Sequence, residues 1–260
     1  MLLSGCAEDA RGTGKTPTPV TPDPTMNGPI VQPADDAVVY GHSATMLYTV
    51  DPDTLAVKPV ANFVWPSGPD EMTDIALDKD GNMVGISFGA VYAIDKSNAK
   101  CTFLSHFSGA SFNGLSFIYA TVADVGQEIL VGASTDGSVY KINPMTGAQT
   151  LIGSYGSGWG SSGDLVSVAG ATYATVSGPF DSSDTLVTVD PTTGKATKIG
   201  STGVSNIWGL GYWKQKLFGF TESSGLVLIN INTGAATPIS NGGTSWYGAG
   251  VTTAAPTTVQ

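Results

Sequence analysis

The sequence predicts an all-β fold, a five-bladed β-propeller, and the prediction depends on two recurring phrases and their spacing. The first phrase is an apolar strand that ends in a tight polar turn, and it occurs five times. The residues that end these strands are Asp51, Asp95, Asn143, Asp190 and Asn230, which are 44, 48, 47 and 40 residues apart. Repeats of about 40 to 50 residues with several strands each are typical of propeller blades. A pair of β-sandwiches is the alternative fold, but it does not account for the regular interval.

The first phrase is clearest at Leu186–Gly194, where a β-branched and apolar strand leads into an Asp-Pro-x-Thr-Gly turn. Nearly every position of this strand is apolar or β-branched, which favours a strand covered on both faces by neighbouring blades. The turn follows from local chemistry. Proline sets φ, aspartate or asparagine accepts backbone N–H groups, and glycine takes the left-handed position.

The second phrase predicts the innermost strand of each blade. It begins with Asp or Gly and continues with apolar and small residues, at Asp74–Leu77, Gly114–Phe117, Asp164–Val166, Gly209–Tyr212 and Gly248–Val251. Small residues suit positions where strands approach one another closely around a central axis. We therefore expect these five strands to line the axis.

The last blade is predicted to be shared between the two ends of the domain. The strand at 246–253 has no partner strands after it, whereas three strands at 38–41, 46–51 and 57–63 have no first strand before them. Joining them completes a fifth blade and removes exposed strand edges. The propeller is predicted to span residues 36–254, with a disordered tail at 255–260.

Composition restricts the partners. Charged residues make up only 12% of the chain, and the net charge is -10. An acidic surface repels phosphate backbones, so we expect no nucleic-acid ligand. No apolar run approaches the roughly 18 residues of a membrane-spanning helix. We expect the propeller to be a monomer.

The N-terminal segment Leu3-Ser4-Gly5-Cys6 resembles the bacterial lipobox, in which a cysteine becomes lipid-modified. Residues 1–6 are therefore expected to be a truncated lipoprotein signal, with Cys6 as the lipidation site. Residues 7–35 are rich in Pro, Thr and Gly, and predict a disordered tether because they cannot bury enough apolar surface. The resemblance implies attachment through lipid to the bacterial cell envelope, at the outer membrane or cell surface.

The turns of the repeat, such as Asp190–Gly194, resemble those of bacterial YVTN-type and quinoprotein-like propellers over residues 36–254. Quinoprotein repeats usually place Trp shortly after the Thr-Gly turn, but here Ala148, Lys195 and Ala235 follow. No quinone or other cofactor is therefore expected. No metal site is expected either, because the chain has two histidines and the turn at 78–82 lacks the later glutamate of a calcium loop.

Aromatic residues in the loops that enter the first strands are the candidate ligand-binding residues. They are Trp65, Phe112, Trp159, Trp208, Trp246 and Tyr247. Gathered at one mouth of the axis, they would form a shallow bowl that stacks sugar rings or grips a peptide or partner loop. The alternative is that each aromatic fills the hydrophobic gap between adjacent blades.

Two acids break the repeat and are the candidate catalytic residues. Asp74 and Asp164 occupy the position where the other three blades have glycine. Paired carboxylates across the mouth would suit a glycosidase. The alternative is that they cap backbone N–H groups where the strands begin.

The leading hypothesis is a lipid-anchored cell-envelope propeller that acts as a ligand-binding or protein-interaction scaffold, for glycan or protein, and not as an enzyme. The alternative is a propeller-type glycoside hydrolase or lyase that uses the carboxylates at the mouth. No Gly-x-Ser-x-Gly, Walker or dinucleotide fingerprint is present in a strand-turn-helix context.

Overall fold

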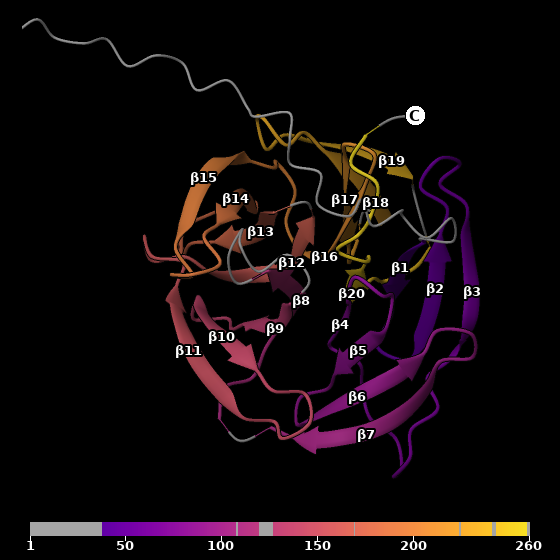
Figure 1. Ribbon diagram of the computed structural model, residues 1–260. Coiled ribbons are helices and arrows are strands. Elements are labelled where there is room, and N and C mark those ends of the chain that lie inside the picture. The colour runs from indigo at the N-terminus through magenta and orange to yellow at the C-terminus, as the bar shows by residue number, and fades with distance from the viewer. Residues whose placement is uncertain are drawn as a thin grey trace, which may run out of the picture. The chain divides into compact units, whose positions relative to one another are not determined.

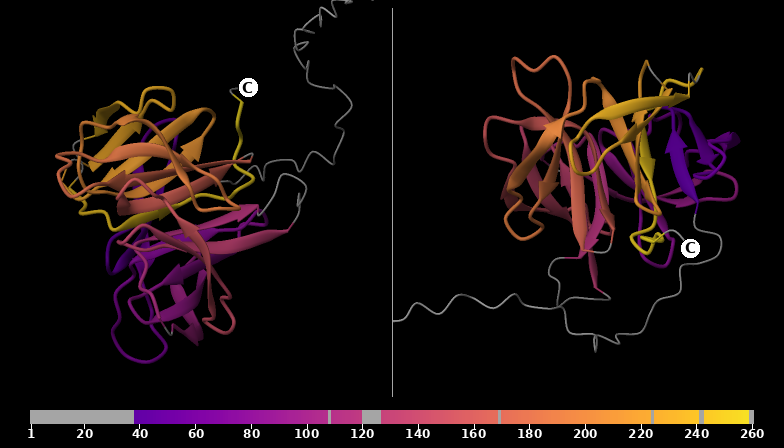
Figure 2. Two further views of the ribbon diagram at one scale, coloured as in Figure 1. Left: turned by 90° about the vertical axis from the view of Figure 1, so that its left-hand side faces the viewer. Right: turned by 90° about the horizontal axis from the view of Figure 1, so that it is seen from above.

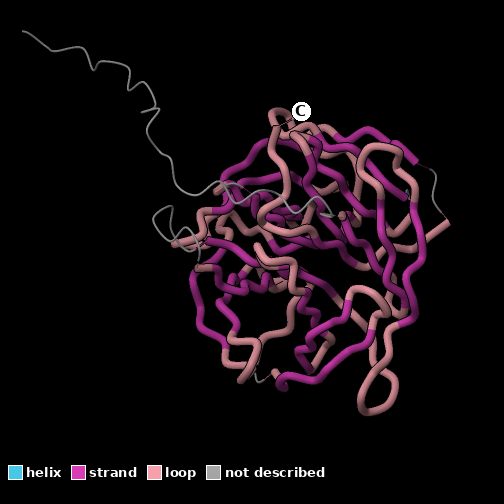
Figure 3. The backbone as a smooth tube through the Cα atoms, turned by 45° about the vertical axis from the view of Figure 1, so that its right-hand side comes forward, coloured by secondary structure: helices cyan, strands magenta, loops and turns pink. Residues whose placement is uncertain are grey.

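The computed structural model describes residues 38–107, 109–119, 127–168, 170–223, 225–240 and 243–258. In these ranges the chain is all-β, with five four-stranded antiparallel sheets and no helix. Figure 3 shows the described chain coloured as strands that alternate with loops. The fold class predicted from the repeat is therefore confirmed. The lipobox with Cys6 and the tether at 7–35 lie outside the described residues.

Each sheet is one blade, and its strands run from the axis outward. The first blade in the chain has β20 (Gly248–Gly250), β1 (Val39–His42), β2 (Met46–Val50) and β3 (Val57–Asn62). The second has β4 (Asp74–Leu77), β5 (Met83–Ile86), β6 (Ala90–Asp95) and β7 (Lys100–His106). The third has β8 (Gly114–Tyr119), β9 (Glu128–Ala133), β10 (Ser138–Ile142) and β11 (Gln149–Ser154). The fourth has β12 (Gly160–Val168), β13 (Ala171–Ser177), β14 (Thr185–Val189) and β15 (Ala196–Ser201). The fifth has β16 (Ile207–Trp213), β17 (Lys216–Thr221), β18 (Gly225–Ile229) and β19 (Ala236–Ser240).

The innermost strands form a closed ring around the propeller axis. Each contacts the next in the order β4, β8, β12, β16, β20 and back to β4. Figure 1 shows these five strands in the middle of the molecule, with β3, β7, β11, β15 and β19 at the outside. Because all five inner strands run the same way, the loops that enter them meet at one end of the axis, the mouth.

Strands from both ends of the domain close the ring. β20 pairs with β1 in antiparallel register, with His42 opposite Gly248 and Tyr40 opposite Gly250. The Tyr247 N–H also donates to the His42 carbonyl at 2.8 Å. Figure 2 shows the C-terminal strand beside the N-terminal ones. This confirms the predicted shared blade and leaves no unpaired inner strand.

The repeated turn has the expected chemistry. In the fourth blade, Asp190 Oδ1 accepts the N–H groups of Thr192 and Thr193 at 2.8 and 3.3 Å. Gly194 then adopts a φ of +69°. Leu55 takes the same left-handed position at +63° in the first blade, so the turn forms there even without glycine.

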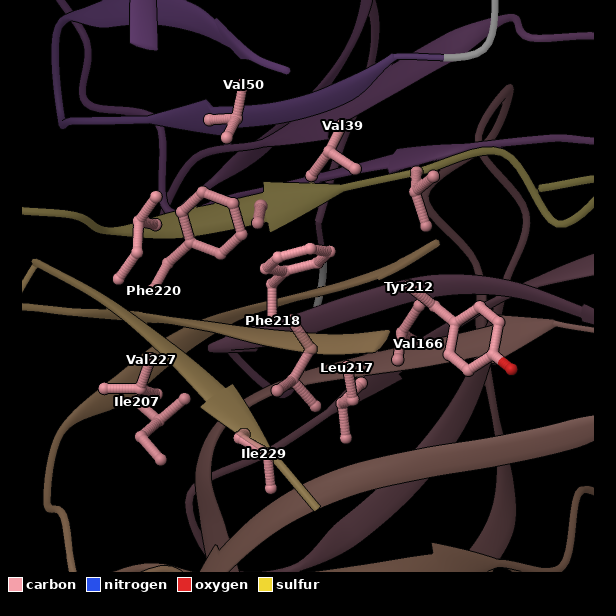
Figure 4. Close-up of a cluster of buried hydrophobic side chains, with 14 of the residues drawn as sticks. Val39, Val50, Val166, Ile207, Tyr212, Leu217, Phe218, Phe220, Val227 and Ile229 are labelled. Carbon is pink, nitrogen blue, oxygen red and sulfur yellow. The ribbon is translucent and has the colours of Figure 1, made fainter. Parts of the chain in front are cut away.

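The hydrophobic core lies between blades. Figure 4 shows the cluster between the fifth blade and its neighbours, where Phe218 and Phe220 are both fully buried. The third strands β14 and β18 are buried at four of their five positions, because a neighbouring blade covers each face. Their continuous apolar sequence is therefore explained by cover on both sides.

Glycines in the second strands of the first and third blades leave room for a large side chain. A Cβ on Gly41 would lie 2.8 Å from the rings of both Phe220 and Trp246. The equivalent glycine of the third blade, Gly132, would meet Phe112 at 2.7 Å. Phe112 and Trp246 each stand two residues before the Gly that begins the inner strand. They fill the gaps that these glycines leave.

The C-terminal limit differs from the prediction. β20 covers only Gly248–Gly250, not 246–253, and the ordered chain continues beyond 254. Ala255 is buried, and the Pro256 carbonyl accepts the Lys214 N–H at 2.7 Å. The predicted tail at 255–260 therefore begins too early, because its first residues pack on the fifth blade. Among the described residues there is no helix that could cross a membrane.

Candidate functional site

A cavity of about 300 Å³ opens at the mouth of the axis. Four of the five blades contribute to its wall. The lining residues are Thr73, Phe88, Phe112, Asn113, Thr135, Trp208, Glu222 and Tyr247. Four of these side chains belong to aromatic residues, so the wall is predominantly apolar.

Half of the lining comes from one repeated position, immediately before the residue that faces the axis. Thr73, Asn113, Trp208 and Tyr247 precede Asp74, Gly114, Gly209 and Gly248, respectively. Equivalent positions of the inner strands lie at the same height along the axis, so these four side chains gather at one level. The fourth blade has Gly163 at this position and contributes no side chain to the wall.

Three more lining residues come from the turns between the second and third strands. Phe88 lies between β5 and β6, Thr135 between β9 and β10, and Glu222 between β17 and β18. These three residues were not among the predicted site residues, which all came from the loops that enter the first strands. The signal for Phe88 was a large apolar residue at the tip of a Ser-Phe-Gly turn, and its side chain is 68% exposed.

The structure brings three of the six predicted aromatics into this cavity. Trp208 and Tyr247 line it as half-buried and exposed residues. Phe112 also lines it, although it is only 5% exposed and packs edge-on against Phe107 and Tyr140.

The other three predicted aromatics lie elsewhere. Trp246 is 1% exposed, with its ring edge-on to Tyr48 and Phe220 at 5.2 Å each. Trp65 packs against Phe63 and Tyr92 in the core between the first and second blades.

Trp159 is partly buried against the core between the third and fourth blades. For it, as for Trp246 and Trp65, the alternative, filling hydrophobic gaps between or within blades, describes the observed packing.

Two polar side chains of the cavity are held by backbone carbonyls. The Thr73 hydroxyl donates to the Ile86 carbonyl at 3.1 Å. Asn113 Nδ2 donates to the Ser161 carbonyl at 3.0 Å, while Asn113 Oδ1 is buried without a partner among the described residues. Glu222 is the one charged residue of the lining.

The two candidate acids lie one residue further along the inner strands and are fully buried. Asp74 accepts the N–H of Ile75 at 2.8 Å and that of Leu115, in the next blade, at 2.6 Å. Each carboxylate thus joins its own strand to the inner strand of the following blade.

Asp164 repeats this arrangement two blades further on. It accepts the N–H of Leu165 at 2.6 Å and that of Leu210, in the next blade, at 2.8 Å. A Cβ on Gly248 would lie 2.3 Å from Asp74 Oδ1, so glycine at this position makes room for the acid. The observed bonds are those of the capping alternative.

The pKa values of Asp74 and Asp164 are both raised, which favours their protonated forms. Burial raises the pKa of Asp74 well above its ordinary value, and the neighbouring Asp164 charge raises it further. Burial likewise raises the pKa of Asp164 well above its ordinary value. Because the two carboxyl groups interact, ionisation of both at once is disfavoured, and one of them is favoured in its protonated form.

His42 adjoins the acid pair as a neutral ring. Its Nδ1 donates to the Ser43 carbonyl at 2.9 Å, and its Nε2 lies 3.8 Å from Asp74 Oδ1. Burial lowers the pKa of His42 to about 4, so the imidazole is uncharged near neutral pH. Across the described ranges, no group of three or more His, Cys, Asp or Glu residues is placed to hold a metal ion.

Comparison with known proteins found solved structures of similar fold but no family to which the chain belongs. No protein-family model and no curated protein matches the sequence. The chain is similar to one from a crystal structure of a nidogen/laminin complex, with a TM-score of 0.52 and 8% identity over 86% of this chain and 99% of that one. A protein of unknown function from Bacteroides caccae gives a TM-score of 0.46 and 10% identity, over 79% of this chain and 73% of the other. BamB from Moraxella catarrhalis gives 0.36 and 17%, over 77% and 60%.

Proposed function

We propose that this chain is a binding module whose ligand, a glycan or a protein segment, occupies the cavity at the mouth of the propeller. The observation that carries the proposal is the convergence of Phe88, Trp208 and Tyr247 on one cavity from three different blades. Phe88 and Tyr247 are 68% and 42% exposed. Large rings exposed together at a concave surface are typical of ligand sites, because a bound apolar face removes them from water.

The hydrolase alternative has weaker support. Asp74 and Asp164 are both fully buried, and each carboxylate is occupied by two backbone N–H groups. A glycosidase requires two carboxyl groups that flank a scissile bond and leave space for substrate or water. The hydrogen bonds of Asp74 and Asp164 to the next blade favour a role in holding the blades together.

Trp208→Ala is expected to weaken capture by the cavity. Ring-stacking residues at the centre of binding sites contribute about 2 kcal/mol or more, so capture should fall at least about tenfold. The measurement is binding of the folded protein to a glycan array and to an immobilised peptide library.

The matched control is Phe180→Ala, which removes a ring that is 98% exposed and lies outside the cavity lining. This control should bind like the wild type. Equal capture by wild type, Trp208→Ala and Phe180→Ala would refute the cavity as the binding site.

We further propose that the module is anchored to the bacterial cell envelope through lipid on Cys6, which supports a role in capturing ligands at a membrane surface. The lipobox resemblance and the following Pro-rich stretch support this proposal. Cys6→Ala, expressed with a full signal sequence, is expected to lose labelling by a fatty-acid probe. Cys101→Ala should retain labelling, because Cys101 is a buried free thiol within the propeller. Labelling of Cys6→Ala equal to that of the wild type would refute lipid attachment at Cys6.

A further inference from the structure

We propose that the mouth cavity binds a basic side chain of a peptide, with the guanidinium of arginine as the preferred group. The inference rests on the proposed binding function and adds the chemical class of the ligand. It follows from the sign of charge in the cavity, from the polar atoms that stay free there, and from the rings around them.

The charge of the lining is negative. Glu222 is exposed at the turn between β17 and β18, and none of the eight lining residues is Lys, Arg or His. Asn206 Nδ2 donates to Glu222 Oε2 at 3.2 Å, which holds the carboxylate without neutralising it. The net charge of -10 extends the attraction for cations beyond the cavity.

The lining offers acceptors to a cation. The Thr73 hydroxyl and the Asn113 amide each donate to a backbone carbonyl, at 3.1 and 3.0 Å. Asn113 Oδ1 is left buried and unpaired among the described residues, and a buried acceptor without a partner costs about 1–3 kcal/mol. A guanidinium offers five N–H donors and needs only acceptors, which the Glu222 carboxylate and Asn113 Oδ1 can supply.

The rings complete the match. Trp208, Tyr247 and Phe88 present aromatic surface to the cavity that also contains Glu222. Guanidinium planes stack on aromatic faces, and the methylene stem of arginine covers apolar surface. A volume of about 300 Å³ suits one side chain better than an oligosaccharide.

The test compares Nα-acetyl-arginine N-methylamide with its citrulline counterpart, which has nearly the same shape and no charge. In titration calorimetry at low ionic strength, the wild type should bind the arginine compound at least about tenfold more tightly. Glu222→Gln should abolish this preference, because it keeps the shape of the side chain and removes its charge. Added salt should narrow the preference, since Glu222 is exposed.

Asp53→Asn is the matched control. It also removes one negative charge, but at the turn after β2, at the end of the blade away from the mouth. The preference for arginine should persist in this variant. Equal affinity for both compounds, or loss of the preference in Asp53→Asn as well, would overturn the inference.

No detectable binding of either compound would also overturn it. The proposed binding function would then be judged separately by the arrays and Trp208→Ala, which do not require a basic ligand. Capture of neutral glycans that depends on Trp208 would retain the function and reject this ligand class.

Discussion

Asp164→Ala is expected to lower the free energy of unfolding by about 3 kcal/mol or more, because it leaves two buried backbone donors without acceptors. These donors are the N–H groups of Leu165 and Leu210, which bind the Asp164 carboxylate at 2.6 and 2.8 Å. Asp74 also loses the neighbouring carboxyl group that raises its pKa. Urea unfolding measures the loss. Asp53→Ala, at an exposed turn, should change the free energy of unfolding by less than about 1 kcal/mol.

Asp164→Asn is expected to be intermediate. The amide keeps one oxygen for one of the two N–H groups and turns an NH₂ toward the other. It also removes the ionisable group while preserving volume, so it separates the effect of charge from the effect of packing. A loss as small as that of Asp53→Ala would show that the carboxylate does not hold the inner strands together.

The same variants are expected to differ in the pH dependence of stability. The pKa values of Asp74 and Asp164 are raised by burial, so the folded state holds a proton that the unfolded chain releases near pH 4. The stability that this proton contributes is complete below about pH 4 and is lost as pH rises through the raised folded pKa.

His42 acts in the opposite direction over part of that range. Its folded pKa is about 4, below the 6.5 of the free side chain. Its contribution is present above about pH 6.5 and is lost as pH falls through about 4. Between about pH 4 and 6.5, the contribution of His42 opposes that of the acid pair.

The acid pair is therefore expected to make wild-type stability fall as pH rises above about 4, and this contribution should be smaller in Asp164→Asn. Burial also raises the pKa values of Glu128 and Asp184, so the difference between the two proteins isolates the acid pair. Urea midpoints at several pH values from 5 to 9 measure it. Parallel profiles for wild type and Asp164→Asn would contradict the raised pKa values of the acid pair.

The architecture was predictable because each blade repeats turns and strands whose residue types are recognisable in the sequence. The Asp190 turn and the Asp74–Leu77 strand were recognisable from their residue types alone, and the structure places β4 at those bounds. The shared blade followed from counting strands, since β20 lacked partners in its own unit. The extent of the last inner strand and the end at 254 were wrong, and the burial of Ala255 depends on a surface that the sequence does not reveal.

The cavity was less predictable because it depends on the direction of side chains. Trp246 and Tyr247 are adjacent in sequence, yet one fills a gap between blades and the other faces the mouth. Alternation along the strand separates them, and its phase is fixed only by the register between β20 and β1. Glu222 reaches the cavity from a different turn, so no loop-by-loop reading would place it there.

Gly200→Ala is expected to destabilise the propeller by about 3 kcal/mol, near the upper end for overpacking substitutions. A Cβ on Gly200, in the outer strand β15, would lie 2.0 Å from the Thr233 carbonyl oxygen. Thr233 belongs to the turn between β18 and β19, so the contact joins the fourth blade to the fifth. Both sides are backbone, and the clash can be relieved only by moving one blade relative to the next.

The same contact recurs one blade earlier, where a Cβ on Gly153 would lie 1.9 Å from the Thr193 carbonyl oxygen. Gly153→Ala should therefore match Gly200→Ala in thermal unfolding. Gly89→Ala is the control, because its Cβ would have no neighbour within 4 Å, and its stability should stay within about 0.5 kcal/mol of wild type. If both alanines at 153 and 200 were as mild as Gly89→Ala, the turns would not be packed against the outer strands. The repeated Thr-Gly turn would then serve its own blade alone and not the spacing between blades.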